Sequence, residues 1–368
     1  MSKPKIIAFY LPQYHPTPDN DKWWGRGFTE WTNVGKAKPL FKGHYQPKVP
    51  ADLGYYDLRL PEVREAQAEL AKEAGIYGFC YWSYWFGNGK EELELPFNEV
   101  LRLGKPEFPF MLCWCNESWY RKMWNKDAGG NIKELLLEQQ YPGKEDIINH
   151  FYHRLPAFRD KRYIKYDNKP LFMIYDWQFY PDVSEFIKIW RELSKKEGFD
   201  DIIFIAHQRG ELSISEEKKI FDMGFDYINY SNFSQVYKKS YNIFQRTKNK
   251  FINIFIKKPI VISYRKFQKN FYNIIKYEDK IFPTLYPNWD PTARRGYNTA
   301  ILNDAQPIYF KELCKKVLLK LKEKKGLNII FIRAWNEWGE GNYMEPDLKY
   351  GKGYIKALRD AINENSLL

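Results

Sequence analysis

The sequence predicts an α/β fold, a (β/α)8 TIM barrel that residues 1–368 form as one domain. Short runs of β-branched and aromatic residues recur eight times, with amphipathic, helix-like stretches between them. This alternation predicts parallel strands covered by helices, and eight units are the number that closes a barrel. No GxGxxG follows the first run, which disfavours a doubly wound nucleotide-binding sheet.

The strands are predicted where apolar runs are continuous, because barrel strands are buried on both faces. They are residues 5–11, 78–82, 110–115, 171–176, 202–207, 227–230, 282–286 and 329–335. Helices are predicted where apolar residues recur every three or four positions, as in the segment that Pro61 opens and Gly75 closes. They are residues 61–74, 144–158, 183–198, 215–223 and 309–325.

The positive charge of the chain is concentrated in one segment. Residues 237–281 contain twelve Lys or Arg and two acidic residues, which accounts for ten of the twelve net charges. The rest of the chain is near neutral, which disfavours a nucleic-acid binder. The segment is too long for an ordinary connection between strands six and seven, so we expect an insertion there. Its apolar patches, residues 251–256, 260–262 and 271–275, predict helices with a basic outer face.

Two functions stay open for this insertion. It would contact anionic lipid head groups or the phosphates of a lipid-linked glycan at the inner membrane face, or it would be a basic flap that lengthens a barrel loop. The start of the chain runs into its first strand without a signal-peptide pattern, and no run approaches the ~20 apolar residues that cross a bilayer. Four cysteines without a CxxC pair favour a reducing setting. We therefore expect a cytoplasmic protein, with peripheral membrane contact as the further alternative.

The strongest candidates for catalysis follow the last predicted strand. Glu337 and Glu340 stand three residues apart, flanked by Trp335 and Trp338, whose rings we expect to wall the pocket and contact substrate. In a (β/α)8 barrel the reacting groups lie at the carboxyl ends of the strands. Cleavage of a glycosidic bond needs one protonated and one ionised carboxyl, and burial beside a tryptophan separates their pKa values in this way. Two exposed glutamates on a surface loop are the alternative.

A second carboxylate competes for a catalytic role. Asn116 and Glu117 end the third strand, so Glu117 would face Glu337 across the barrel mouth. A separation of ~5 Å would indicate a retaining and ~6.5–9.5 Å an inverting glycosidase. A glutamate that only binds substrate explains Glu117 equally well.

Other residues at the strand ends are candidates for binding an oligosaccharide or polysaccharide. Aromatic rings stack on sugar faces, although core packing is as good an explanation for each; these residues are Trp31, Trp82, Tyr84, Trp119 and Trp289. Polar side chains would bind hydroxyls or orient the two glutamates; these are Gln13, Tyr14, Glu30, Asn116, Asp290 and Arg294, with Asn336 in the last loop. No Walker loop, DxD motif or zinc-ligand spacing occurs, so no cofactor or metal is expected.

Several Trp-rich motifs resemble a known family. Residues 334–341, AWNEWGEG, followed by Glu345 and Pro346, are similar to the catalytic loop of glycoside hydrolase family 99, the endo-α-mannosidases and endo-mannanases. The whole chain resembles the related WbsX family of O-antigen and capsule gene clusters, whose members are often described as glycosyltransferases. The motifs shared with it are AFYLPQYHP (8–16), WWGRGFTEWTNV (23–34), CYWSYWF (80–86), LCWCNESW (112–119), NWDPTAR (288–294) and AWNEWGEG (334–341).

The resemblance implies a retaining hydrolase that acts on a bacterial surface polysaccharide, with mannose as a candidate sugar. Glu337 would take the proton of the 2-hydroxyl, so that a 1,2-anhydro sugar forms, and Glu340 would protonate the departing oxygen. Family 99 has a histidine where this sequence has Gly339. A glycosyltransferase or transglycosidase in surface-polysaccharide synthesis and a non-catalytic carbohydrate-binding protein remain the alternatives.

Overall fold

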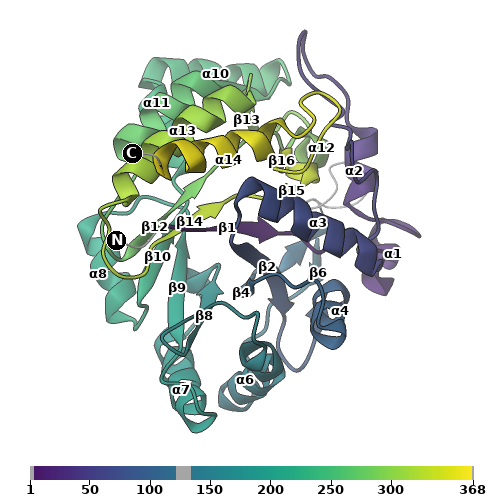
Figure 1. The fold of residues 1–368 in the computed structure, drawn as a ribbon. Coiled ribbons are helices and arrows are strands. Elements are labelled where there is room, and N and C mark those ends of the chain that lie inside the picture. Colours follow the sequence, from purple (N-terminus) through teal and green to yellow (C-terminus); the bar gives the residue numbers. More distant parts are fainter. Residues whose placement is uncertain (1–3, 122–133, 367–368) are drawn as a thin grey trace.

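The computed structural model describes residues 4–121 and 134–366, and its centre is a closed barrel of eight parallel strands (Figure 1). Residues 1–3, which belong to the predicted start without a signal-peptide pattern, lie outside the described part. Strand β1 pairs with both β2 and β14, which closes the sheet. The barrel strands are β1 (Lys5–Tyr10), β2 (Gly78–Trp85), β4 (Phe110–Trp114), β8 (Lys169–Ile174), β9 (Ile203–Gln208), β10 (Tyr227–Tyr230), β12 (Ile281–Leu285) and β14 (Ile329–Ile332). The predicted (β/α)8 barrel is confirmed.

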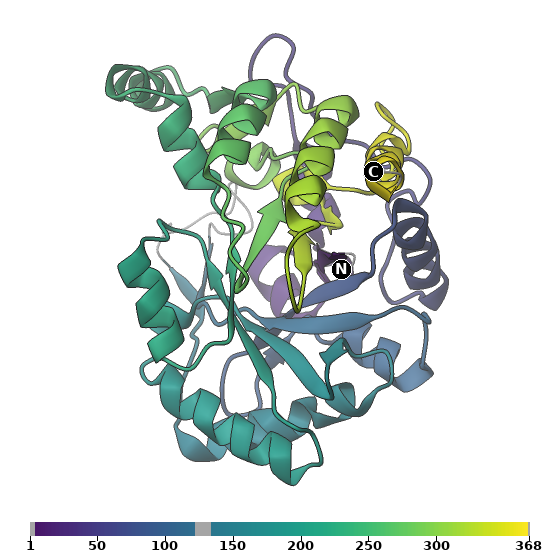
Figure 2. The ribbon, with the colours of Figure 1, turned by 60° about the vertical axis from the view of Figure 1, so that its left-hand side comes forward.

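Helices cover the outside of the barrel between successive strands (Figures 1 and 2). The five predicted helices form, and α4 and α14 join them; α14 packs against α13 and α3. The bounds are α3 (Pro61–Ala74), α4 (Leu95–Leu103), α6 (Lys144–Arg159), α7 (Val183–Lys196), α8 (Ile214–Asp222), α13 (Pro307–Leu321) and α14 (Gly353–Ser366). Within the described ranges, none of the helices has the length and apolar character needed to cross a bilayer.

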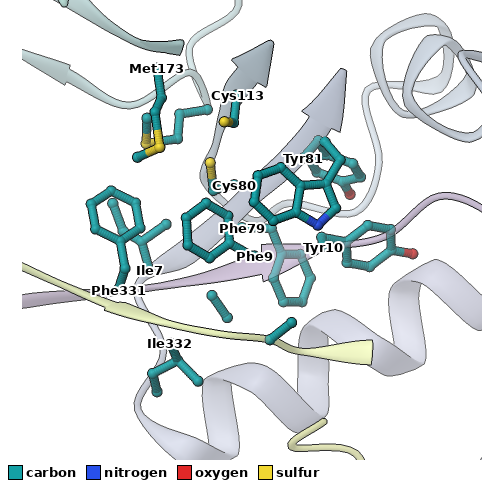
Figure 3. Packing of buried hydrophobic residues seen from close by; sticks show 14 of the residues in the cluster. Ile7, Phe9, Tyr10, Phe79, Cys80, Tyr81, Cys113, Met173, Phe331 and Ile332 are labelled. Carbon is teal, nitrogen blue, oxygen red and sulfur yellow. The ribbon is translucent and has the colours of Figure 1, made fainter. Parts of the chain in front are cut away.

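Side chains fill the barrel interior, as Figure 3 shows around β1. The Phe9 ring stacks on Trp82 at 4.3 Å between ring centroids and on Phe331 at 5.3 Å. The next residue, Tyr10, points outward and packs against Phe79, because side chains alternate along a strand. A packed interior leaves the mouth of the barrel as the place for a ligand.

Residues 237–281 contribute two helices and a strand. Helix α9 (Phe233–Ser240) leads into α10 (Ile243–Phe255), β11 (Ile260–Ser263) and α11 (Tyr264–Ile274). The prediction of a helix at 260–262 is wrong, because these β-branched residues pair in parallel with β13 (Ala300–Asn303). Helix α11 buries Phe267 and Phe271 and packs against α9 and α13, so this part of the segment belongs to the helical layer of the barrel.

Short elements build the loops around the strand ends. In the long connection after β1 lie α1 (Pro18–Trp24) and α2 (Glu30–Lys36), and α12 (Thr292–Arg295) follows β12. The remaining elements are β3 (Glu91–Glu92), β5 (Trp119–Tyr120), β6 (Leu135–Leu137), β7 (Lys165–Tyr166), β15 (Asn336–Glu337), β16 (Asn342–Tyr343) and the 3-10 turns η1 (Trp177–Phe179) and η2 (Trp338–Glu340).

Candidate active site

A cavity of about 390 Å³ opens where the barrel strands end. This volume lies in the range of pockets that hold small ligands, ~300–1,000 Å³. Eight of the predicted site residues line it: Trp82, Tyr84, Glu117, Trp119, Trp289, Arg294, Glu337 and Glu340. Both candidate catalytic glutamates therefore face one hollow that is walled by aromatic rings.

The loop that carries the two glutamates is fixed to the end of β1. It continues β14 as the hairpin β15–β16, with η2 at its tip. The Asn336 side chain accepts a hydrogen bond from the Leu11 amide at 2.7 Å and donates one to the Leu11 carbonyl at 3.0 Å. The Tyr14 hydroxyl accepts from the Trp338 amide at 3.0 Å and donates to the Asn336 carbonyl. These contacts hold Glu337 and Glu340 in place on one turn.

Glu337 is buried, and the pKa of its carboxyl lies near neutral pH. Burial raises the pKa of its carboxyl to about 7, with the neighbouring Glu340 charge as the next cause, while Arg333 and Arg294 oppose the rise. The Trp82 indole donates a hydrogen bond of 2.9 Å to Glu337 Oε1. The glutamate is therefore poised between its two protonation states at the pH at which general acids and bases work best.

Glu340 is the ionised partner of the pair. Burial acts to raise the pKa of its carboxyl, but Arg294 and Arg333 outweigh burial and hold the pKa below its usual value. Arg294 Nη1 lies 3.0 Å from Glu340 Oε1, and Arg333 Nη2 lies 3.7 Å from Oε2. The two carboxyls interact directly, because Glu340 raises the pKa of Glu337 and Glu337 lowers the pKa of Glu340, so the pair holds one proton between these two pKa values. In this unliganded state the proton resides on Glu337, whereas the implied roles need it on Glu340 when the leaving oxygen departs.

An ion pair occupies the space beside Gly339. Arg294 Nε donates to Glu30 Oε2 at 2.7 Å, and Asn33 donates to Glu30 Oε1 at 2.9 Å. A Cβ added at Gly339 would overlap the Glu30 carboxylate and lie 3.0 Å from Arg294 Nε. The Glu30–Arg294 pair thus fills the place that the family 99 histidine would need, and it orients Arg294 toward Glu340.

A second charged cluster lies in the wall of the same cavity. Arg209 bridges Glu117 at 3.0 Å and Asp176 at 2.8 Å. Burial raises the pKa of Asp176 to about 7, and the nearby Glu117 charge contributes to the rise against the opposing effect of Arg209. Glu117 is therefore held by an arginine on the cavity wall, while Glu337 and Glu340 face each other on one loop.

The two tryptophans that flank the glutamates do not line the cavity, contrary to the prediction that they wall it. Trp335 packs behind the loop against Phe79, with 5.5 Å between ring centroids. Trp338 stacks on Tyr343 at 3.9 Å and donates a hydrogen bond of 2.6 Å to Glu345. Both rings point away from the cavity, and their contacts with Phe79, Tyr343 and Glu345 stabilise the loop. The aromatic walls come from Trp82, Trp119 and Trp289 instead.

The remaining predicted binding residues lie behind the cavity wall. Trp31 donates its indole N–H to the Tyr56 carbonyl at 2.7 Å, and Asn116 ties β4 to β8 by hydrogen bonds to the backbone of Asp176. Asp290 is buried in a neighbouring hollow, where its carboxylate lies 2.9 Å from His44. Outside the cavity lining are Gln13, Tyr14, Glu30, Trp31, Asn116, Asp290, Trp335, Asn336 and Trp338.

Sequence reasoning missed several residues of the cavity, most importantly three arginines. Arg333 was assigned to the interior of strand 329–335, but β14 ends at Ile332 and Arg333 turns into the pocket. Arg209 stands two residues beyond the predicted strand 202–207, and Arg295 stands one residue beyond the predicted site residue Arg294. The missed lining residues are Cys115, Tyr175, Arg209, Ser231, Phe233, Ser234, Tyr286, Arg295 and Arg333. Within the described ranges, no cluster of three or more His, Cys, Asp or Glu is placed to hold a metal ion.

The fold and this pocket define a (β/α)8 protein with a buried carboxyl pair of the kind that glycoside hydrolases use. The chain belongs to the family described as Glycosyltransferase WbsX, which matches residues 6–358. Two curated relatives, both named uncharacterized protein WxcX, come from Xanthomonas campestris pv. campestris strains ATCC 33913 and B100. Each is 33% identical over 359 residues. The match covers 97% of this chain and 49% of either relative, so the chain spans about half of their length.

Solved structures confirm the fold. A family 99 endo-α-mannosidase from Bacteroides thetaiotaomicron, in complex with bis-tris-propane, is similar with a TM-score of 0.57 and 16% identity, over 98% of this chain and 97% of that one. A protein described as glycoside hydrolase-like gives a TM-score of 0.62 at 13% identity, over 98% and 94%. At these identities the likeness establishes a shared barrel architecture.

Proposed function

We propose that this chain is a retaining glycoside hydrolase that acts on a bacterial surface polysaccharide through a 1,2-anhydro sugar. The observation that carries the proposal is that the buried carboxyls of Glu337 and Glu340 line one aromatic-walled cavity, where each shifts the pKa of the other so that the pair holds one proton. The family's association with O-antigen and capsule gene clusters supports a bacterial polysaccharide as the substrate. The endo-α-mannosidase neighbours make mannose the first sugar to test.

The reaction requires the shared proton on Glu340. Binding of the leaving oxygen beside Glu340 favours transfer of the proton from Glu337 to Glu340, and the resulting Glu337 carboxylate accepts the 2-hydroxyl proton. The 2-oxygen then attacks the anomeric carbon, the glycosidic bond breaks, and Glu340 protonates the departing oxygen. In the second step Glu340 takes a proton from water and the water oxygen attacks the anomeric carbon. The bond between the anomeric carbon and the 2-oxygen breaks, and Glu337 returns its proton to the 2-oxygen.

The charges around the pair suit this sequence of proton transfers. Arg294 and Arg333 stabilise whichever glutamate is ionised, because both lie within 4 Å of the pair. The Trp82 indole donates to Glu337 and favours its carboxylate form. The site also contains two carboxyls on one turn, which reach adjacent atoms of one sugar ring without a nucleophile on the opposite wall.

The test is digestion of a panel of O-antigen and capsular oligosaccharides, including α-mannosides, with Glu340→Gln as the matched control. We expect release of a product whose first-formed anomer, observed by proton NMR, keeps the configuration of the substrate. The variant should lose ~10²-fold or more in rate. An inverted first anomer, or equal cleavage by the variant, would contradict the proposed mechanism.

A glycosyltransferase or transglycosidase is the second candidate, and the arginines of the cavity favour it. Arg209, Arg295 and Arg333 line the pocket, and the exposed Arg295 has no ion-pair partner among residues 4–121 and 134–366. These cations would bind the phosphates of a sugar nucleotide. Mass spectrometry separates the functions: chain extension from a nucleotide sugar indicates a transferase, redistribution among acceptors a transglycosidase, and shortening a hydrolase. If the protein is a non-catalytic carbohydrate-binding protein, the Glu337→Gln variant should retain its full function.

A further inference from the structure

Helix α10 presents large apolar side chains to solvent. Five of these residues are exposed, with 52 to 82% of their surface accessible, and they are Ile243, Phe244, Phe251, Ile254 and Phe255. At 100° per residue these positions fall within an arc of roughly 120° on one side of the helix. Thr247, which is also exposed, lies inside the same arc. We call these five apolar residues the outer arc of α10.

The opposite side of α10 is polar and faces the protein. Asn253 is buried, and its side chain donates hydrogen bonds to the Tyr297 carbonyl at 2.6 Å and to the Lys258 carbonyl at 2.9 Å. A surface helix of a globular domain normally buries its apolar stripe and exposes its polar side. Helix α10 has the reverse arrangement, so its outer arc is directed toward something other than the body of this chain. Figures 1 and 2 show α10 at the outer edge of the helical layer that contains α11 and α13.

Basic side chains border the outer arc. Lys248 and Lys250 stand at its two edges on the helical wheel, and both are exposed. Lys257 and Lys258 follow the helix and are exposed as well. The segment 237–281 as a whole contains twelve basic and two acidic residues, so the outer arc lies in a strongly basic part of the chain with exposed lysines beside it.

This combination selects the kind of partner. A second copy of the chain would bring a like-charged surface against this one, which repulsion disfavours. The phosphates of a nucleic acid would bind the lysines, but they would not contact exposed phenylalanine and isoleucine side chains favourably. An anionic bilayer satisfies both features, because its head groups attract lysine and its acyl boundary accepts an apolar helix face.

We propose that α10 docks this protein on an anionic phospholipid bilayer, with the outer arc inserted at the head-group boundary and Lys248 and Lys250 on the lipid phosphates. The helix lies in the plane of the interface, as its 13 residues and its polar inner side require. The proposal concerns attachment and does not depend on which glycan the cavity accepts.

The experiment measures binding of the full chain to vesicles by co-sedimentation. Vesicles of phosphatidylglycerol and phosphatidylethanolamine are compared with vesicles of phosphatidylcholine. We expect binding to the anionic vesicles that is weakened about tenfold or more by the triple substitution Phe244→Ser, Phe251→Ser and Phe255→Ser. The matched control is Ile214→Ser. Ile214 lies on α8, outside the outer arc, and is 85% exposed, so this variant should bind the vesicles as the unsubstituted chain does.

A second measurement reports insertion directly. Thr247→Cys, labelled with an environment-sensitive fluorophore, places the dye inside the outer arc, while the four native cysteines are buried. A blue shift on anionic vesicles is expected. The proposal is overturned if the chain does not bind, if the triple variant binds equally well, or if the dye spectrum is unchanged. Light scattering that shows dimers lost in the triple variant, without vesicle binding, would assign the arc to a second copy instead.

Discussion

The Glu30 carboxylate occupies the space into which a side chain at Gly339 would project. Because Glu30 also holds Arg294 at 2.7 Å, and Arg294 contacts Glu340, a side chain at 339 would disturb the Glu337–Glu340 pair through this ion pair. We predict that Gly339→Ala lowers the free energy of unfolding by about 1–3 kcal/mol, as overpacking of a buried site does, and reduces turnover. Denaturant unfolding and initial rates measure the two effects.

Gly35→Ala is the matched control for this prediction. Gly35 lies on α2, the helix that also carries Glu30, but an added Cβ would meet nothing within 4 Å. Alanine favours a helix over glycine by up to ~1 kcal/mol, so stability should be unchanged or higher. Equal stability and equal turnover of Gly339→Ala and Gly35→Ala would show that the Glu30–Arg294 ion pair can shift without a loss of free energy.

The separate roles of the two glutamates predict different responses to the leaving group. Glu340→Gln removes the acid, and a nitrophenyl leaving group needs little protonation, so activity on such a glycoside should recover relative to the natural linkage. Glu337→Gln removes the group that takes the 2-hydroxyl proton, so it should stay slow on both substrates. The measurement is the ratio of kcat/KM values for nitrophenyl and alkyl glycosides. Recovery by Glu337→Gln instead would exchange the two roles.

The shared proton predicts a bell-shaped pH dependence of kcat/KM. Activity requires one proton on the pair. As pH rises through about 7, the pKa of Glu337, the pair loses this proton and activity falls. As pH falls through the lowered pKa of Glu340, below its ordinary 4.5, the pair takes up a second proton and activity falls again. Initial rates between pH 3 and 9 test both limbs.

Arg333→Gln should move both limbs of this profile to higher pH. Its guanidinium lowers the pKa of Glu337 and of Glu340, so its removal makes both carboxyls hold their protons more firmly. Arg333→Lys keeps the positive charge and should leave the limbs closer to those of the unsubstituted chain. A profile that does not move in the glutamine variant would show that Arg333 has no electrostatic effect on the pair.

Glu117 is predicted to affect substrate binding more than the chemical step. It is paired with Arg209 on the cavity wall, whereas Glu337 and Glu340, the proposed catalytic pair, lie on the loop after β14. We expect Glu117→Gln to raise KM with a small change in kcat. A loss of kcat as large as that of Glu337→Gln would instead support the alternative in which Glu117 is a catalytic acid or base across the barrel mouth.

The barrel and the position of its site were predictable because they follow from local patterns. Each strand is a continuous apolar run, and the parallel register brings the residues after Trp114 and Ile332 to the same mouth. Side-chain direction was harder to predict. Trp335 and Trp338 follow the same strand as Glu337, yet they point away from the cavity, because tertiary packing on Phe79 and Tyr343 decides their orientation.

The arginines show why the electrostatics of the site could not be read from the sequence. Arg294 contacts Glu30 across 264 positions and Glu340 across 46, and no local pattern encodes such long-range ion pairs. The helix predicted at 260–262 failed for the same reason. Its strand forms by pairing with β13, about forty residues further along the chain.

Trp82 offers the most specific test of how the protein sets the proton affinity of Glu337. The Trp82 ring stacks on Phe9 with 4.3 Å between ring centroids, and its indole N–H donates to Glu337 Oε1 at 2.9 Å. Trp82→Phe keeps an aromatic ring that can stack on Phe9 but removes this donor. Because this donor favours the ionised carboxyl, its loss should raise the pKa of Glu337 and move the basic limb of kcat/KM upward. Calorimetry should measure how the affinity for a non-cleaved oligosaccharide depends on pH. Trp82→Phe alone should move this pH dependence upward, and Trp82→Phe added to Glu337→Gln should leave it unchanged. If Trp82→Phe shifts the pH dependence equally with Glu337 and with Glu337→Gln, Trp82 acts through packing rather than through its hydrogen bond to Glu337.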